Sequence, residues 1–142
     1  MPTPVTPLLA TDAVVIDPLG RLLLIRRKFP PFQGMYALPG GFVEVDETLE
    51  DACRRELLEE TGVKAGRLQL VGVYSDPKRD PRRHAVSAVY LTRVRSSKAV
   101  AGDDAAALEW VKNWRSVDLA FDHALVVKDA MRLLRKQSGR AS

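Results

Sequence analysis

The sequence has one cysteine, two histidines and no apolar run approaching the length of a membrane span. Cys53 alone cannot form an intrachain disulfide, which excludes a disulfide-stabilised secreted domain and is compatible with a reducing compartment. A spanning helix needs about 20 apolar residues, and the N-terminus has no basic region followed by an apolar core. These absences predict a cytoplasmic protein without a signal peptide or membrane partner.

The cysteine and histidines also predict little nucleophilic chemistry. Cys53 falls on the apolar side of an expected helix, so we interpret it as a small buried hydrophobic residue. His84 and His123 stand in no nucleophile motif, and no serine–histidine–aspartate arrangement is recognisable. Each histidine is expected to be structural or to contact a substrate.

The composition fits a single domain covering residues 1–142. A hydrophobic fraction of 46% is enough for one core. Residues 1–7 contain three prolines and are expected to be a flexible arm, as are residues 138–142 at the other end. The sequence leaves the oligomeric state open, with a homodimer as one alternative.

The net charge of +4 admits two interpretations. Basic residues concentrate at 26–28, at 78–83 and near the C-terminus. A nucleic-acid partner would explain them, but acids are interspersed and no aromatic residues alternate with them. We therefore expect solvated basic faces and a small anionic substrate, with no nucleic-acid partner.

Hydrophobic periodicity predicts an α/β sandwich with a mixed sheet. The tripeptide Pro39-Gly40-Gly41 predicts a tight turn. The expected helices cover residues 49–61 and 123–137. The expected strands cover residues 8–17, 21–27, 36–38, 42–45, 67–74, 84–94 and 108–111.

The helix at 49–61 has clear boundary signals and an unusual acidic face. Thr48 followed by Asp51 predicts an N-terminal capping box, and Gly62 predicts the C-terminal end. Glu56, Glu59 and Glu60 are spaced at i, i+3 and i+4, so their side chains share one face. Their mutual repulsion must be offset, and a divalent cation that prefers oxygen ligands would do so.

This segment resembles the Nudix box at every fixed position. The matching residues are Gly41, Glu47 and the run Arg55-Glu56-Leu57-Leu58-Glu59-Glu60-Thr61-Gly62-Val63, preceded by Leu38-Pro39-Gly40. An amphipathic surface helix with a solvated acidic face would explain Glu59 and Glu60. It would leave the fixed register of Gly41, Glu47 and Gly62 unexplained.

The resemblance implies a Nudix-type α/β/α sandwich and a Mg²⁺-dependent hydrolase of phosphoanhydride bonds, with Mn²⁺ as an alternative ion. It implies that Arg55 orients a glutamate and that Glu47 assists the metal site. An i,i+4 pair between Arg55 and Glu59 is also available. The metal ligands it implies are Glu56, Glu59, Glu60 and the carbonyl of Gly40.

The loop after the box resembles that of ADP-ribose pyrophosphatases, which carry a proline at about the position of Pro77. Arg79 and Arg82 are predicted to contact a diphosphate, and Asp80 to accept hydrogen bonds from ribose hydroxyls. A proline-stiffened loop with local salt bridges is the alternative. Stacking on adenine is one possible role for the aromatic rings of Phe29, Phe32 and Tyr36. Anchoring of loops is the alternative role for the same rings.

One departure from that subgroup concerns the residue that activates water. Members often have a glutamate shortly after an Asp-Asp pair, whereas Asp104 is followed here by alanines at 105–107. Asp104 or Glu109 is a candidate substitute for that glutamate, and slow hydrolysis is the alternative.

The sequence therefore predicts hydrolysis of ADP-ribose to AMP and ribose 5-phosphate. Nucleoside triphosphate pyrophosphohydrolysis is a second reading, and an inactive ADP-ribose-sensing module is a third. Cleavage of NADH is disfavoured because the zinc-ligand cysteines common in that branch are absent.

Overall fold

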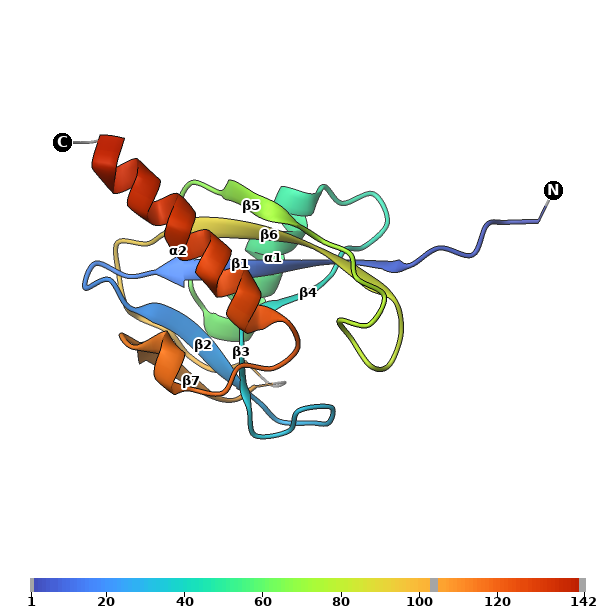
Figure 1. Cartoon of the computed structure of the whole chain (residues 1–142), viewed down its shortest axis with the longest axis horizontal. Helices are drawn as coiled ribbons and strands as arrows, with labels where there is room; N and C mark the ends of the chain where they lie inside the picture. Colours follow the sequence, from blue (N-terminus) through green and yellow to red (C-terminus); the bar gives the residue numbers. More distant parts are fainter. Residues whose placement is uncertain (1, 103–104, 141–142) are drawn as a thin grey trace.

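The computed structural model describes residues 2–102 and 105–140, and it confirms an α/β fold with a mixed sheet. Helices α1 (Leu49–Thr61) and α2 (His123–Arg140) lie on opposite sides of the sheet (Figure 1). A short 3₁₀ helix covers Trp114–Ser116. The strands are β1 (Leu8–Ile16), β2 (Leu22–Arg27), β3 (Tyr36–Ala37), β4 (Gly40–Phe42), β5 (Gln69–Tyr74), β6 (Ala85–Arg93) and β7 (Ala105–Val111).

Strand β1 is the centre of the sheet. It runs parallel to β6 along its whole length, and β6 pairs antiparallel with β5. On its other edge β1 pairs antiparallel with β4 near its start and with β2 at its end. Strand β2 then pairs with β3 and β7. The start of β1 therefore lies beside the segment that leads into α1.

Alternate residues of β1 face the two helices, as expected for a strand buried on both sides. Val14 and Ile16 belong to the cluster that includes Val126, Val127 and Ala130 of α2. The intervening residues Ala13 and Val15 belong to the cluster of Cys53 and Leu57 of α1. Cys53 is buried, and burial raises the pKa of its thiol to about 12, which agrees with its interpretation as a core residue.

The predicted turn at Pro39-Gly40-Gly41 is wrong. Gly40 and Gly41 instead begin β4 and pair with Asp12 and Thr11 of β1. A Cβ on Gly40 would lie 2.2 Å from the carbonyl oxygen of Thr11. These glycines thus allow close packing between strands. In the sequence alone, a glycine pair that packs closely in a strand looks the same as a glycine pair in a turn.

Beyond β4, two element boundaries differ from prediction by three residues. Strand β7 begins at Ala105, three residues before the expected start, because its alanines pair with Arg26 and Arg27 of β2. Helix α2 continues to Arg140, past the expected flexible tail at 138. In the described part of the chain, neither helix combines the length and apolar character needed to cross a bilayer.

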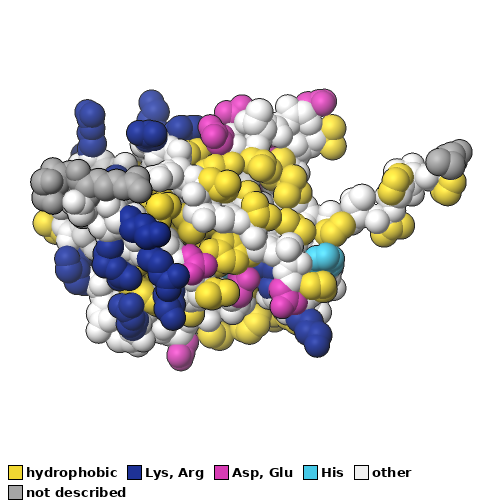
Figure 2. All heavy atoms as spheres, turned by 45° about the horizontal axis from the view of Figure 1, so that its top comes forward, with side chains coloured by type: hydrophobic (Ala, Val, Ile, Leu, Met, Phe, Trp, Pro, Cys, Tyr) yellow, Lys and Arg dark blue, Asp and Glu magenta, His cyan; other side chains and the backbone are white. Residues whose placement is uncertain are grey.

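Basic side chains from separate parts of the sequence gather at one end of the molecule. Figure 2 shows Lys and Arg concentrated around the C-terminal end of α2. One hollow at this end has no acidic side chain among its described lining residues. Its basic side chains are Lys64, Arg67, Arg93, Arg95 and Lys98.

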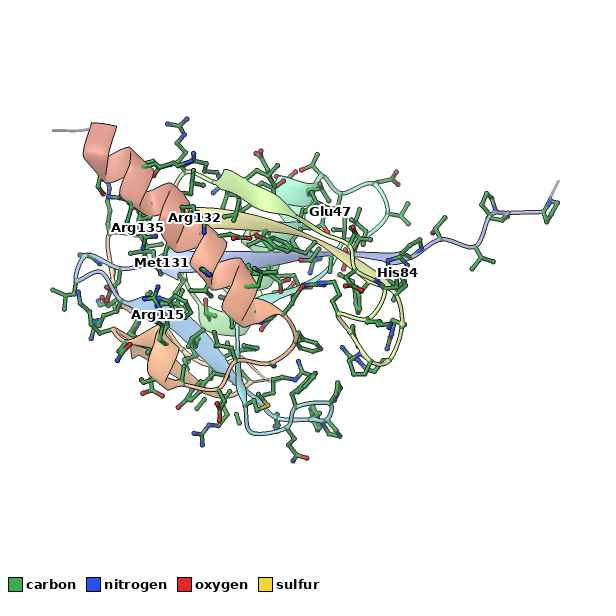
Figure 3. The ribbon with its side chains drawn as sticks, in the orientation of Figure 1. Glu47, His84, Arg115, Met131, Arg132 and Arg135 are labelled. Carbon is green, nitrogen blue, oxygen red and sulfur yellow. The ribbon has the colours of Figure 1, made fainter. Side chains whose placement is uncertain are left out.

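Residues 2–7 form no helix or strand and extend away from the start of β1 (Figure 1). His84 and Glu47 lie toward that same end of the molecule, whereas Arg132 and Arg135 lie along α2 toward the other (Figure 3). The Nε2 atom of His84 is 2.9 Å from the carbonyl oxygen of Ser75, so this histidine connects the two ends of the loop between β5 and β6.

Candidate functional site

Capping interactions fix both ends of α1. The Thr48 hydroxyl accepts a hydrogen bond of 3.1 Å from the backbone N–H of Asp51. Gly62 adopts the left-handed conformation at φ 68°, and its N–H donates to the carbonyl of Leu58. Both predicted boundaries are confirmed, and they set which residues of α1 face the sheet and which face outward.

One guanidinium holds the acidic side of the helix together. Arg55 donates to both oxygens of Glu47 at 2.7 and 3.0 Å, to Glu56 at 2.9 Å and to Glu59 at 3.3 Å. It also donates to the carbonyl of Phe42, which connects the helix to β4. The expected i,i+4 pair between Arg55 and Glu59 is present. Hydrogen bonding to Arg55 lowers the pKa of Glu47 to about 2.

The ionised form of Glu56 is less stabilised by its surroundings than that of Glu47. Burial raises its pKa above the ordinary value, and the hydrogen bond from Arg55 does not compensate. The charges of Glu59 and Glu47 raise it further. A cation beside Glu56 would remove this cost, because an opposite charge favours the ionised form.

The two glycines of β4 let carboxylates approach the strand. A Cβ on Gly41 would lie 2.4 Å from the carboxyl carbon of Glu56. The N–H of Gly40 donates to Glu60 Oε1 at 3.1 Å. Glu56 and Glu60, one helical turn apart, therefore both lie against the backbone of β4.

A cavity of about 420 Å³ opens beside these two carboxylates. Its walls come from β1, β2, β3, β4, the start of β6, α1, the loops after β2 and β5, and the start of α2. Its charged and imidazole side chains are Asp12, Arg27, Lys28, Glu56, Glu60, Arg79, Asp80, Arg82 and His123.

The donor set suits a hard divalent ion that keeps part of its water shell. Glu56 and Glu60 face the cavity beside Gly40, and Glu59 is on the same helix with a side chain 59% exposed. Within residues 2–102 and 105–140, no three His, Cys, Asp or Glu side chains already form a metal-binding group. In the structure Arg55 donates to Oε1 of Glu56 and to Oε2 of Glu59, so the other oxygen of each carboxylate receives no hydrogen bond from Arg55 and is the one that can bind an ion.

Two bidentate ion pairs hold the predicted substrate loop, which follows β5, in its conformation. Arg79 donates to both oxygens of Asp122 at 2.8 and 2.9 Å. Arg82 donates to both oxygens of Asp80, at 2.8 and 3.1 Å. Arg79, Asp80 and Arg82 line the cavity, whereas Pro77 is not among its lining residues. The local salt-bridge network and the placement at the cavity are thus both present.

The remaining candidates are placed as follows. Glu109 lies on β7, where it accepts a hydrogen bond from the hydroxyl of Tyr36, and it is not among the cavity-lining residues. Asp104 lies outside the described residues. Phe29 lines the cavity, and the ring of Phe32 packs edge-on against Phe121 at 4.9 Å.

Sequence reasoning missed several residues of the cavity. Asp12 falls within an apolar strand, and only the register of β1 with β4 brings it to the site. Arg27 stacks on the ring of Phe121, with its guanidinium carbon 4.8 Å from the ring centre. A charged residue in an otherwise apolar strand is the one signal that could have indicated Asp12.

Comparisons with known proteins agree with this geometry. The family model of the NUDIX domain matches residues 6–136. The chain is 47% identical over 126 residues to an ADP-ribose pyrophosphatase of Methanocaldococcus jannaschii, covering 89% of this chain and 74% of that protein.

Two solved structures are similar to the fold. The NUDIX domain of Shewanella oneidensis NrtR, in complex with ADP ribose, has a TM-score of 0.84 and 28% identity, covering 91% of this chain and 89% of that chain. A bifunctional NMN adenylyltransferase/ADP ribose pyrophosphatase of Francisella tularensis, with AMP and a manganese ion, has a TM-score of 0.78 and 27% identity. That match covers 89% of this chain and 42% of that one. Members of the family typically depend on a divalent metal. Together with the glutamates of α1, these matches establish that the chain belongs to the NUDIX family of pyrophosphohydrolases.

Proposed function

We propose that this protein hydrolyses ADP-ribose to AMP and ribose 5-phosphate in the presence of Mg²⁺, with Mn²⁺ as an alternative ion. The observation that carries the proposal is the juxtaposition of Glu56 and Glu60 with a nucleotide-sized cavity. The relative from M. jannaschii, similar over most of this chain, supports ADP-ribose as the substrate.

The metal site is proposed to consist of Glu56, Glu59, Glu60 and the carbonyl of Gly40. A divalent ion bound there supplies charge neutralisation for the diphosphate and lowers the pKa of a bound water. Arg55 is proposed to set the orientation of these carboxylates through the hydrogen bonds described above.

Glu47 holds the guanidinium of Arg55 in place. It accepts two hydrogen bonds from the guanidinium and one of 3.0 Å, through Oε1, from the backbone N–H of Glu44. Its pKa of about 2 keeps it ionised at neutral pH. We propose that it acts on the metal site mainly through Arg55.

At the other side of the cavity, Arg79, Asp80 and Arg82 are proposed to bind the diphosphate and ribose. Each arginine is already oriented by a carboxylate, so little rotamer entropy is lost when substrate binds. Pro77 is proposed only to stiffen this loop. Water activation is assigned to the metal site and not to Glu109, because Glu109 is bound to Tyr36 outside the cavity lining.

The test is a panel of nucleotides assayed with Mg²⁺ and with Mn²⁺, comparing the wild type with Glu60→Gln. ADP-ribose should give AMP and ribose 5-phosphate, and the variant should lose this activity. Release of pyrophosphate from nucleoside triphosphates would instead support the second reading. Tight binding of ADP-ribose without turnover by the wild type would support a sensing module.

A further inference from the structure

Asp12 is a largely buried carboxylate whose charge has no cation beside it. Its side chain is 14% exposed. One oxygen, Oδ2, accepts a hydrogen bond from the hydroxyl of Ser87. Among the described residues no Lys or Arg lies within ion-pair distance of it, although its charge contributes to the raised pKa of Arg79. The imidazole of His123 is close to it. Burying a carboxylate with one neutral donor is costly, so a further donor is expected to bind it.

His123 is held in one tautomer. The backbone N–H of Leu38 donates to its Nδ1 at 3.1 Å, so the ring proton must be on Nε2. Burial lowers the pKa of the imidazole, which keeps it neutral in this environment. Its Nε2 atom lies 3.9 Å from Asp12 Oδ1, too far for a hydrogen bond between them.

The pair lines the cavity, and the neighbouring strand leaves room for it. Gly40 is the residue paired with Asp12 across β1 and β4, and a Cβ there would lie 2.4 Å from Asp12 Oδ1. The ring of Phe121 lies 5.4 Å from that of His123. The small and apolar side chains that line the same cavity include Ala10, Ala37, Leu38 and Ala85. A flat ring with polar atoms on one edge fits such surroundings.

Asp12 and His123 present an acceptor and a donor side by side. Adenine presents the complementary pattern on one edge, with the 6-amino group as donor and N7 as acceptor. Guanine and hypoxanthine carry an acceptor oxygen in place of the amino group. We propose that Asp12 and His123 together read this edge of adenine and so determine the base specificity of the site. This inference rests on the proposed function for the rest of the substrate.

The test compares three nucleoside monophosphates by calorimetry, with the wild-type protein and Mg²⁺. They are AMP, purine riboside 5′-monophosphate, which lacks the 6-amino group, and 7-deaza-AMP, which lacks N7. AMP should bind about 10- to 100-fold more tightly than the analogue without the amino group, as expected for a hydrogen bond to a charged acceptor. The 7-deaza analogue should also bind more weakly than AMP.

The variant Asp12→Ala should remove the discrimination, so that AMP and purine riboside 5′-monophosphate bind equally. Ser87→Ala is the matched control, because it removes a partner of Asp12 and keeps the carboxylate; discrimination should persist. Equal affinity of the wild type for all three nucleotides overturns the proposal, and this measurement needs no variant to fold. The proposal is also overturned if Asp12→Ala weakens the binding of AMP and of purine riboside 5′-monophosphate by the same factor.

The outcome is separable from that of the proposed function. Hydrolysis of ADP-ribose with no discrimination among the monophosphates would overturn the adenine contact alone. Discrimination without hydrolysis of ADP-ribose would sustain the adenine contact and overturn the assignment of the reaction.

Discussion

Two carboxylates removed from solvent, Asp17 and Glu56, are treated very differently by the fold. Asp17 lies in the turn between β1 and β2 with its side chain fully buried. It accepts hydrogen bonds from the N–H groups of Leu19 and Arg21, from the Arg21 guanidinium and from the Ser97 hydroxyl. Burial by itself raises its pKa, but these hydrogen bonds outweigh burial and the pKa lies below its usual value.

Glu56 has only a share of one guanidinium. Arg55 divides its donors among three carboxylates, so burial dominates and the pKa of Glu56 is raised. A carboxylate that serves folding is saturated with donors from its own chain. One that serves binding is left partly unsatisfied at a cavity, and the ligand completes it.

The largest effect is expected from Glu60→Gln. If Glu60 holds a metal, this substitution should reduce hydrolysis of ADP-ribose about 10³-fold, because a metal contributes several kcal/mol to the transition state. The free energy of unfolding, from urea titration, should change little. Turnover within a few fold of the wild type would remove Glu60 from the metal site.

Asp17→Asn should lower the free energy of unfolding and leave the activity unchanged, the opposite of Glu60→Gln. It leaves Arg21 without its buried partner and should cost about 3 kcal/mol of unfolding free energy. Activity per folded molecule should remain that of the wild type, since Asp17 does not line the cavity. A loss of activity larger than the unfolded fraction would contradict the division between the two carboxylates.

Arg55→Lys tests how the acidic side is organised. A lysine keeps the charge but cannot donate to Glu47, Glu56 and Glu59 at once. Activity should fall about 10- to 100-fold, the range typical when a partner of a metal ligand is lost. A higher Mg²⁺ concentration should recover part of it. Activity insensitive to this change would show that the network is not needed to orient the ligands.

The pH dependence of stability should differ in sign between the two sites. The pKa of Asp17 is lowered by folding, so its contribution is present above the unfolded value, about 3.9, and is lost as pH falls through the lower folded value. Glu56 is the reverse, because its raised pKa makes the metal-free folded state less stable as pH rises above about 4.3.

Without metal, Glu56→Gln should therefore be more stable than the wild type at neutral pH, by under about 1 kcal/mol. The difference should vanish in acid. Thermal unfolding from pH 3 to 8 in EDTA measures both slopes. A destabilised Glu56→Gln at neutral pH would mean that Arg55 satisfies this carboxylate after all.

Much of α1 was predictable because its determinants are local. The cap at Thr48, the stop at Gly62 and the shared face of Glu56 and Glu60 depend only on residues within a few turns. The pairing of Arg55 with Glu59 follows from the same spacing. The β4 segment was mispredicted because pairing with β1, a contact over some thirty residues of sequence, overrides the turn preference of glycine.

The sequence by itself determined the family and the acidic helix face, because helical spacing places side chains three and four residues apart together in any fold. Only the tertiary structure decided what stands opposite that face. The register of β1 with β4 brings Asp12 to the cavity, the start of α2 adds His123, and Asp122 orients Arg79. These contacts join residues separated by 28 to 111 positions, and the free energy of packing two sheet faces against two helices selects them.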